Sequence, residues 1–236
     1  KRMPYATGAD LENVMNEAAI LAARARKKKI DQQLLVDAIA RVQMGPEKKS
    51  HKVNEQDKRM VAYHEGGHAI VSYYIPECSK VHEITTIPRG QAGGYTMYLP
   101  QEEFNFVTTA RLNAEMASLM GGRVAEAIVF GDISTGASSD IKRATEIARQ
   151  MVTEYGMSEK LGPILFDSSD HSIFIGRDFG TTKSYSEETA AIIDEEVKAL
   201  FDKAAAHCRQ ILTDHRQQLI DLAEYLLEHE TISGEE

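Results

Sequence analysis

The chain has 236 residues, of which 42% are hydrophobic and 27% are charged, and its formal net charge is −9. This composition is ordinary for a soluble globular protein, and no stretch approaches the ~20 uninterrupted apolar residues that a membrane-spanning helix needs. The two cysteines fit no metal or redox spacing, so we expect both to be packing residues in a reducing compartment. Because the chain begins at Lys1 without a methionine, we also expect it to be part of a longer protein.

Residues 1–45 are expected to form two short helices. Thr7 and Asp10 make a capping-box-like start for the first helix, and Asp31 is an N-cap for the second. Apolar residues then recur at helical spacing in both, namely Leu11, Val14, Ala18, Leu21 and Ala22, and then Leu34, Leu35, Ala38, Ile39 and Val42. Two such helices make a unit that is too small to be expected to fold as a domain alone.

The charge balance changes after this helical unit. Residues 1–59 carry 13 Lys and Arg against 8 Asp and Glu, a net charge of +5, whereas residues 60–236 carry 14 against 28. A basic stretch after Gly45 and Pro46 precedes the change, which predicts a linker over residues 46–54. A basic linker can contact nucleic acid, but no aromatic side chain accompanies this one, so we expect no nucleic-acid partner.

The most informative motif is the pentad His64-Glu65-Gly66-Gly67-His68, in a predicted helix that Asn54 caps and Pro76 ends. Two histidines four residues apart lie on one helix face, so both rings can reach a single metal ion. Glu65 projects beside that ion and can take a proton from a metal-bound water. The apolar flanks also fit a buried helix with two incidental histidines, but that alternative does not explain Glu65.

The remaining elements are predicted in chain order from periodicity and turn residues. The fold class is mostly α (α+β), a helical domain with a small β-sheet. We expect strands over 81–87 and 93–99, a long helix over 107–130 interrupted at Gly121-Gly122, a helix from Asp140 to about Tyr155 with Gly156 after its end, a short strand at 164–166, a helix from the capping box Ser184–Glu187 to about Leu212, and a last helix from Asp214 to Glu228.

A catalytic zinc site usually has three protein ligands, so a third ligand is expected outside the pentad. The metzincin spacing requires glycine at 71 and histidine at 74, where this chain has Val71 and Tyr74, so that class is excluded. Asp140 follows a segment of small and polar residues that can approach a site closely, although the helix dipole alone favours an aspartate in a first turn. The residues leave several candidates open: Asp140, Glu126 as ligand or as partner of a ligand, Glu102, Glu103, Glu115, Asp132 and His82.

Taken together, the motifs resemble the FtsH family of membrane-anchored, ATP-dependent AAA+ zinc proteases, and the likeness covers nearly the whole chain. The matching segments are His64–Ala69, Ile87–Gly90, Gly93–Thr96, Gly121–Glu126, Ser134–Asp140, Tyr155–Ser158 and Thr231–Glu236. The resemblance implies that Asp140 is the third ligand of Zn²⁺ and that the strand over 94–98 borders the cleft and pairs with an extended substrate. One departure is Gly66, where the family usually has alanine.

The resemblance also implies the organisation of the protein. Residues 1–45 would be the end of an AAA+ helical lid, residues 46–54 a linker, and residues 55–236 the zinc metalloprotease domain. The expected substrates are polypeptides, either unfolded or membrane proteins, and the expected assembly is a homo-oligomer, a hexamer, at the cytoplasmic face of the bacterial inner membrane. The sequence has no G-x-x-x-x-G-K-[ST] phosphate loop and no anchor, so ATP, Mg²⁺ and membrane contact are expected only in the full-length protein.

The predicted function is therefore zinc-dependent hydrolysis of peptide bonds, in which His64, His68 and Asp140 bind the metal and Glu65 is the general base. Two alternatives remain. The long helices over 186–228 would suit a hydrolytically inactive, ring-forming assembly module. A deformylase-like amidase uses a similar pentad but would not need the lid-like residues 1–45.

Overall fold

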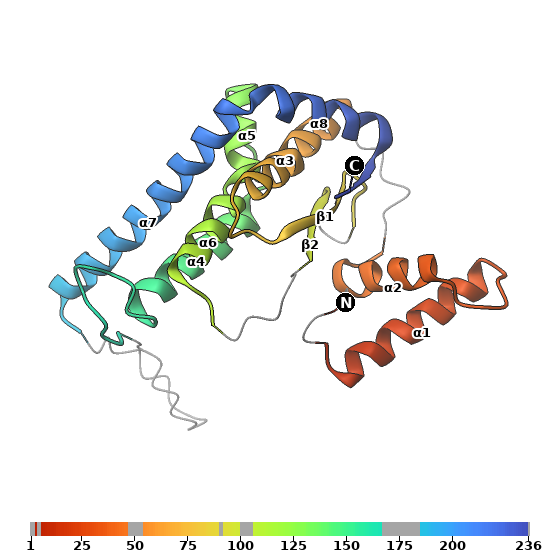
Figure 1. Ribbon diagram of the computed structural model, residues 1–236, viewed down its shortest axis with the longest axis horizontal. Helices are drawn as coiled ribbons and strands as arrows, with labels where there is room; N and C mark the ends of the chain where they lie inside the picture. The colour runs from red at the N-terminus through yellow and green to blue at the C-terminus, as the bar shows by residue number, and fades with distance from the viewer. Residues whose placement is uncertain are drawn as a thin grey trace. The chain divides into compact units, whose positions relative to one another are not determined.

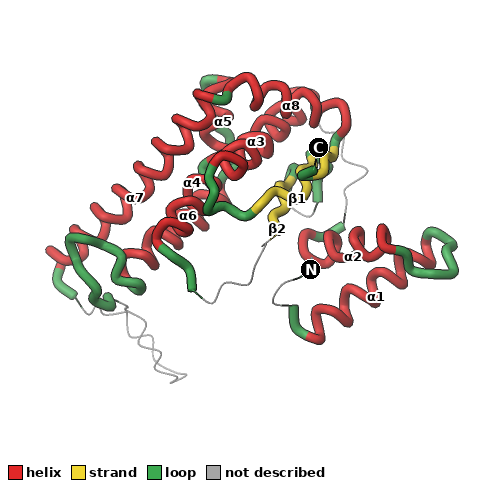
Figure 2. The backbone as a smooth tube through the Cα atoms, viewed as in Figure 1, coloured by secondary structure: helices red, strands yellow, loops and turns green. Residues whose placement is uncertain are grey.

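The computed structural model describes residues 3, 6–46, 54–89, 92–99, 106–166 and 185–235. Helices make up most of this part of the chain, and a small sheet accompanies them (Figure 1, Figure 2), which confirms the mostly α (α+β) class. The elements in order are α1 (Gly8–Arg24), α2 (Gln32–Met44), α3 (Glu55–Tyr74), β1 (Lys80–Thr85), β2 (Tyr95–Leu99), α4 (Thr109–Leu119), α5 (Gly121–Phe130), α6 (Ser138–Thr153), α7 (Glu187–Asp214), α8 (Arg216–His229) and β3 (Thr231–Ser233).

The chain divides into two compact units that alternate along the sequence. The first comprises Lys1–Gly66, Ser79–Phe104 and Gln217–Glu236, and the second comprises Gly67–Cys78 and Asn105–Arg216. The first unit therefore holds α1, α2, the start of α3, the sheet and nearly all of α8. The second holds the rest of α3 and the helices α4 to α7. Across the described residues, no helix combines the length and the apolar character that crossing a membrane requires.

The two predicted N-terminal helices are confirmed. The caps at Thr7 and Asp31 are present, because each side chain accepts a hydrogen bond from the backbone N–H three residues further on. Of the apolar residues that recur at helical spacing in α1, Leu11 is 50% exposed, whereas Val14, Ala18 and Ala22 are buried. The buried cluster between the helices consists of Val14, Ala18 and Ala38.

The sheet is antiparallel, with the strand order β2-β1-β3. Strands β1 and β2 confirm the two predicted strands, with ends that differ by one or two residues. Strand β3 was not predicted, because three residues directly after a helix carry too little alternation to indicate a strand. It forms because β1 supplies its hydrogen-bond partners, and the register places the buried Ile232 opposite the buried Ile84.

The predicted long helix over 107–130 is two helices, α4 and α5, which meet at Met120 beside the expected interruption at Gly121. Helix α6 begins at Ser138, two residues before the expected start. After α6, Gly156 has φ of +61°, the left-handed conformation that a glycine following a helix often adopts.

Between α6 and α7 the structure differs from the expected strand and describes only part of the expected capping box. The strand predicted at 164–166 is wrong: Ile164 and Leu165 are exposed, and the N–H of Phe166 donates to the carbonyl of Thr153 at 2.7 Å. Helix α7 begins after Ser186, whose hydroxyl accepts from the N–H of Thr189, whereas Ser184 lies outside the described residues. Residues 47–53 of the predicted linker also lie outside them.

Both cysteines have free thiols. Burial raises the pKa of the Cys78 thiol to about 11 and that of the Cys208 thiol to about 12. Near neutral pH both thiols are therefore protonated, and a protonated thiol is neither a strong nucleophile nor a metal ligand. This agrees with packing roles for both side chains.

Candidate metal centre

Helix α3 carries the pentad and buries it. Asn54 caps the helix, since its Oδ1 accepts a hydrogen bond from the N–H of Asp57 at 2.7 Å. About two and a half turns further along the helix, the side chains of the pentad are buried: His64 and Glu65 are each 8% exposed and His68 is 7% exposed. Burying three such polar groups costs free energy unless they have partners, so what surrounds them indicates their role.

The ring of His68 is oriented by a hydrogen bond to the backbone. Its Nδ1 lies 2.8 Å from the carbonyl oxygen of Ser118, an acceptor, so Nδ1 carries the proton and donates. In the neutral ring the lone pair is then on Nε2. The hydroxyl of Ser72 donates to the carbonyl of His68 and also pairs with the hydroxyl of Ser118 at 2.7 Å. The hydrogen bond from Nδ1 of His68 to the Ser118 carbonyl is of the type that fixes the tautomer of metal-binding histidines.

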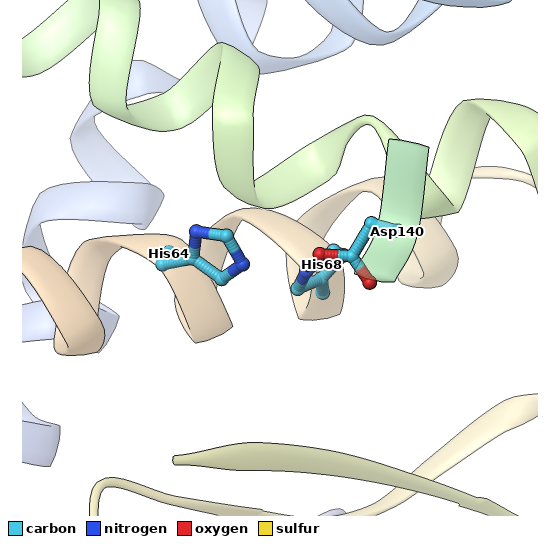
Figure 3. A group of neighbouring side chains, drawn as sticks. All are labelled: His64, His68 and Asp140. Atoms are coloured by element: carbon cyan, nitrogen blue, oxygen red, sulfur yellow. Dashed lines mark ion pairs between the residues drawn. The ribbon is translucent and has the colours of Figure 1, made fainter. Parts of the chain in front are cut away.

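Asp140 lies in the first turn of α6 and points toward His68 (Figure 3). Its Oδ2 is 3.6 Å from the Nε2 of His68. His64 is on α3 one turn before His68, so the helix itself sets the spacing of the two rings. One ligand atom from each of the three residues lies within 4.8 Å of the other two.

This donor set fits zinc. Bonds of about 2.0–2.1 Å at the tetrahedral angle place two ligand atoms about 3.3 Å apart. The 3.6 Å between His68 and Asp140 is close to that value. The widest separation, up to 4.8 Å, has to shorten by about 1.5 Å, which small side-chain rotations can achieve. Two imidazoles and one carboxylate are usual zinc ligands, and three of them leave the fourth position available.

Glu126, the other strong candidate, has a different environment. It is on α5 and only 1% exposed. Its carboxylate accepts hydrogen bonds from the backbone N–H of Ser134 at 2.6 Å and from the hydroxyl of Ser134 at 3.0 Å. That hydroxyl in turn accepts from the N–H of Gly136 at 3.1 Å. Glu126 therefore holds the loop that leads to Asp140, and it is not among the described residues that could hold a metal ion.

The other candidates that lie within the described residues do not join the two histidines. The carboxylate of Glu115 pairs with Arg143 at 3.5 Å, and that of Asp132 accepts from the N–H of Ile133. His82 lies on β1, at the irregularity in its pairing with β2. Glu102 and Glu103 are outside the described residues. Within the described part of the chain, the group that could hold a metal ion consists of His64, His68 and Asp140.

Glu65 has a partner that no motif in the sequence indicated. The hydroxyl of Thr96, on β2, donates to Oε2 of Glu65 at 2.8 Å. The only signal in the sequence was the glycine pair just before β2, which indicates a close approach of backbone. Nothing in the sequence indicated which element the strand would approach.

The two glycines of the pentad have opposite surroundings. A Cβ on Gly67 would lie 2.7 Å from the Cβ of Ala125 and still closer to the carbonyl oxygen of Gly121. A Cβ on Gly66 would meet the end of the Leu219 side chain at 3.3 Å, with no backbone atom nearby. The start of α5 can pack against α3 at this distance because Gly67 has no side chain.

We therefore expect opposite effects from two neighbouring substitutions. Gly67→Ala should destabilise the protein by roughly 1–3 kcal/mol or more, because rigid backbone has to move. Gly66→Ala should stabilise it by up to about 1 kcal/mol, since alanine favours helix and Leu219 can shift slightly. Urea denaturation measures both, and equal losses of stability would contradict this account of the packing.

The whole chain is similar to known proteins of one family. A family profile described as Peptidase family M41 matches residues 51–236. The chain is 52% identical over 236 residues to an ATP-dependent zinc metalloprotease FtsH 1 of Thermoanaerobacter sp. (strain X514), covering 100% of this chain and 39% of that protein. It is 51% identical over 230 residues to an ATP-dependent zinc metalloprotease FtsH of Caldicellulosiruptor bescii, covering 98% and 37%. The corresponding protein of Bacillus subtilis (strain 168) is 48% identical over 236 residues, covering 100% and 36%. The chain thus spans less than two fifths of the length of these relatives.

Proposed function

The chain belongs to peptidase family M41, and from that premise we propose that His64, His68 and Asp140 bind the zinc ion of a metalloendopeptidase in which Glu65 is the general base. The observation that carries the proposal is the gathering of these three ligand atoms around one point, beside a buried glutamate on the same helix. The relatives are named zinc metalloproteases, which supports zinc as the metal.

The residues would share the chemistry of peptide hydrolysis as follows. A bound zinc ion would supply Lewis acidity, which would polarise the scissile carbonyl and lower the pKa of a bound water to about 7. His64 and His68 bind as neutral rings, and the hydrogen bond from His68 to the Ser118 carbonyl keeps that ring in the binding tautomer. Glu65 accepts the proton of the attacking water and passes it to the amine that leaves when the C–N bond breaks.

Polypeptide substrates would bind along the sheet. Strand β2 is at one end of the order β2-β1-β3, and it is also the strand that contacts Glu65 through Thr96. An extended peptide that paired with the outer edge of β2 would have its backbone held in a fixed register near the general base. The side chains of the peptide would then contribute less than its backbone, which suits an enzyme for unfolded chains.

For the whole protein we propose the organisation that the resemblance implies. Residues 1–45 would be the end of an AAA+ helical lid, 46–54 a linker and 55–236 the protease domain. The match of the family profile from residue 51 and the separate buried cluster of α1 and α2 support this division. The proposed assembly is a homo-hexamer at the cytoplasmic face of the bacterial inner membrane. ATP with Mg²⁺, and a membrane anchor, would belong to parts of the protein outside these residues.

Removing the metal tests the proposed function. The purified protein should contain about one zinc ion per chain and should digest an unfolded protein, and a chelator should stop the digestion. Added zinc should restore it. The control is the same protein with the chelator already saturated by zinc. Digestion that continues after the metal has been removed would contradict the proposal, and a ring-forming assembly without hydrolysis would favour the inactive alternative.

A further inference from the structure

We propose that Thr96 is a positioning residue, whose hydroxyl holds the carboxylate of Glu65 in the orientation from which it acts as a base. This inference rests on the proposed function. Oγ1 of Thr96 donates to Oε2 of Glu65 at 2.8 Å and lies 3.3 Å from the backbone carbonyl oxygen of the same residue. Since Glu65 is buried, the hydrogen bond is made away from bulk water, where it is stronger than at the surface.

The start of β2 is packed tightly against the turn of α3 that carries Glu65. A Cβ on Gly94 would lie 2.6 Å from the carbonyl oxygen of Thr85, 2.7 Å from Cγ1 of Val61 and 3.2 Å from Cγ of Glu65. Only glycine permits this approach. Because side chains alternate along a strand, the residue two positions further on faces the same side, and that residue is Thr96.

Thr96 is also fixed within the sheet. It is paired with Ile84 on β1, and Ile84 is paired on its other side with Ile232 on β3. Both isoleucines are buried, so this cross-strand row lies on the covered face of the sheet. The hydroxyl is therefore carried by a strand whose register is set by packing, and a group on such an element is more precisely placed than one on a loop.

A general base needs this kind of support. The glutamate side chain has three rotatable bonds, and its carboxylate must come within about 2.6–3.2 Å of the proton that it accepts. A hydrogen bond to one carboxylate oxygen restricts these rotations. Without it the carboxylate samples other orientations, and a misplacement of about 1 Å can reduce the rate by about 10²-fold.

The test compares Thr96→Val, which keeps the shape but removes the hydroxyl, with Thr96→Ser, which keeps the hydroxyl. In the full-length protein with zinc bound, we expect Thr96→Val to lower kcat for digestion of an unfolded protein by roughly 10- to 100-fold, with little change in KM. Zinc content should equal that of the wild type. Thr96→Ser should restore kcat to within a few-fold of the wild type, which a purely structural role of the threonine would not predict.

Thr231→Val is the matched control, because it removes a threonine hydroxyl from β3 of the same sheet, where the partner is Thr85 rather than Glu65. It should leave kcat unchanged. Crystal structures of the Thr96 variants give a second readout: the Glu65 carboxylate should change its rotamer in Thr96→Val and keep it in Thr96→Ser.

Three results would overturn the inference. These are a wild-type kcat in Thr96→Val, an equal loss of kcat in both Thr96 variants, and an unchanged rotamer of the Glu65 side chain in the Thr96→Val crystal structure. If the wild type itself shows no zinc-dependent digestion, the proposed function fails. The crystal comparison still decides in that case whether Thr96 positions Glu65.

Discussion

Glu65→Gln is expected to reduce peptide hydrolysis by at least roughly 10²–10⁴-fold while the protein keeps its zinc. Glutamine has the shape of glutamate, and its amide oxygen can still accept the hydrogen bond from Thr96, so the local fold should persist. An amide does not take up a proton at neutral pH, and the attacking water would lose its base. Metal analysis and digestion of an unfolded protein, on the same preparation, measure the two properties separately.

The informative contrast is His64→Ala, which removes a donor atom instead of a base. That variant should lose both the zinc and the activity, whereas Glu65→Gln should lose the activity alone. A Glu65→Gln protein that digests substrate at the wild-type rate would show that another group takes the proton. A Glu65→Gln protein without zinc would show that Glu65 supports the metal site.

The second large effect concerns the third donor. Asp140→Ala should lower the affinity for zinc by more than the 10–100-fold that losing an outer hydrogen-bond partner of a metal ligand typically costs. Two imidazoles from one helix turn would remain, and a site with two protein ligands does not meet the usual three of a catalytic zinc centre. Zinc titration in the presence of a competing metal indicator measures the change.

Glu126→Gln is the matched control for Asp140, because both positions were candidates and both carboxylates are in the second unit. Glutamine can still accept from one Ser134 donor but carries no charge. The loop before Asp140 should loosen, and zinc affinity should fall by at most about 10–100-fold, as for an outer partner. If Glu126→Gln lost the metal while Asp140→Ala kept it, the assignment of the third ligand would be reversed.

The helix starts, the spacing of the two histidines and the fold class could be predicted from the sequence, because each depends on residues close together in the chain. An N-cap acts within three residues, so Thr7, Asp31 and Asn54 were recognisable, and all three caps are present in the structure. The spacing of His64 and His68 follows from the helix period alone. The mostly helical class also follows from periodicity summed over long segments, where single errors such as the predicted strand at 164–166 matter little.

Only the tertiary structure decided the contacts between segments that are far apart in the sequence. Glu126 and Asp140 were both plausible partners of the histidines. The structure directs Asp140 to His68 and turns Glu126 toward the Ser134 backbone. In the same way, Thr96 meets Glu65 because Gly94 lets the start of β2 approach α3, and β3 forms because β1 offers it an edge. A helix or a cap depends on neighbours along the chain, whereas these contacts depend on how distant elements pack, and local pattern carries no information about that.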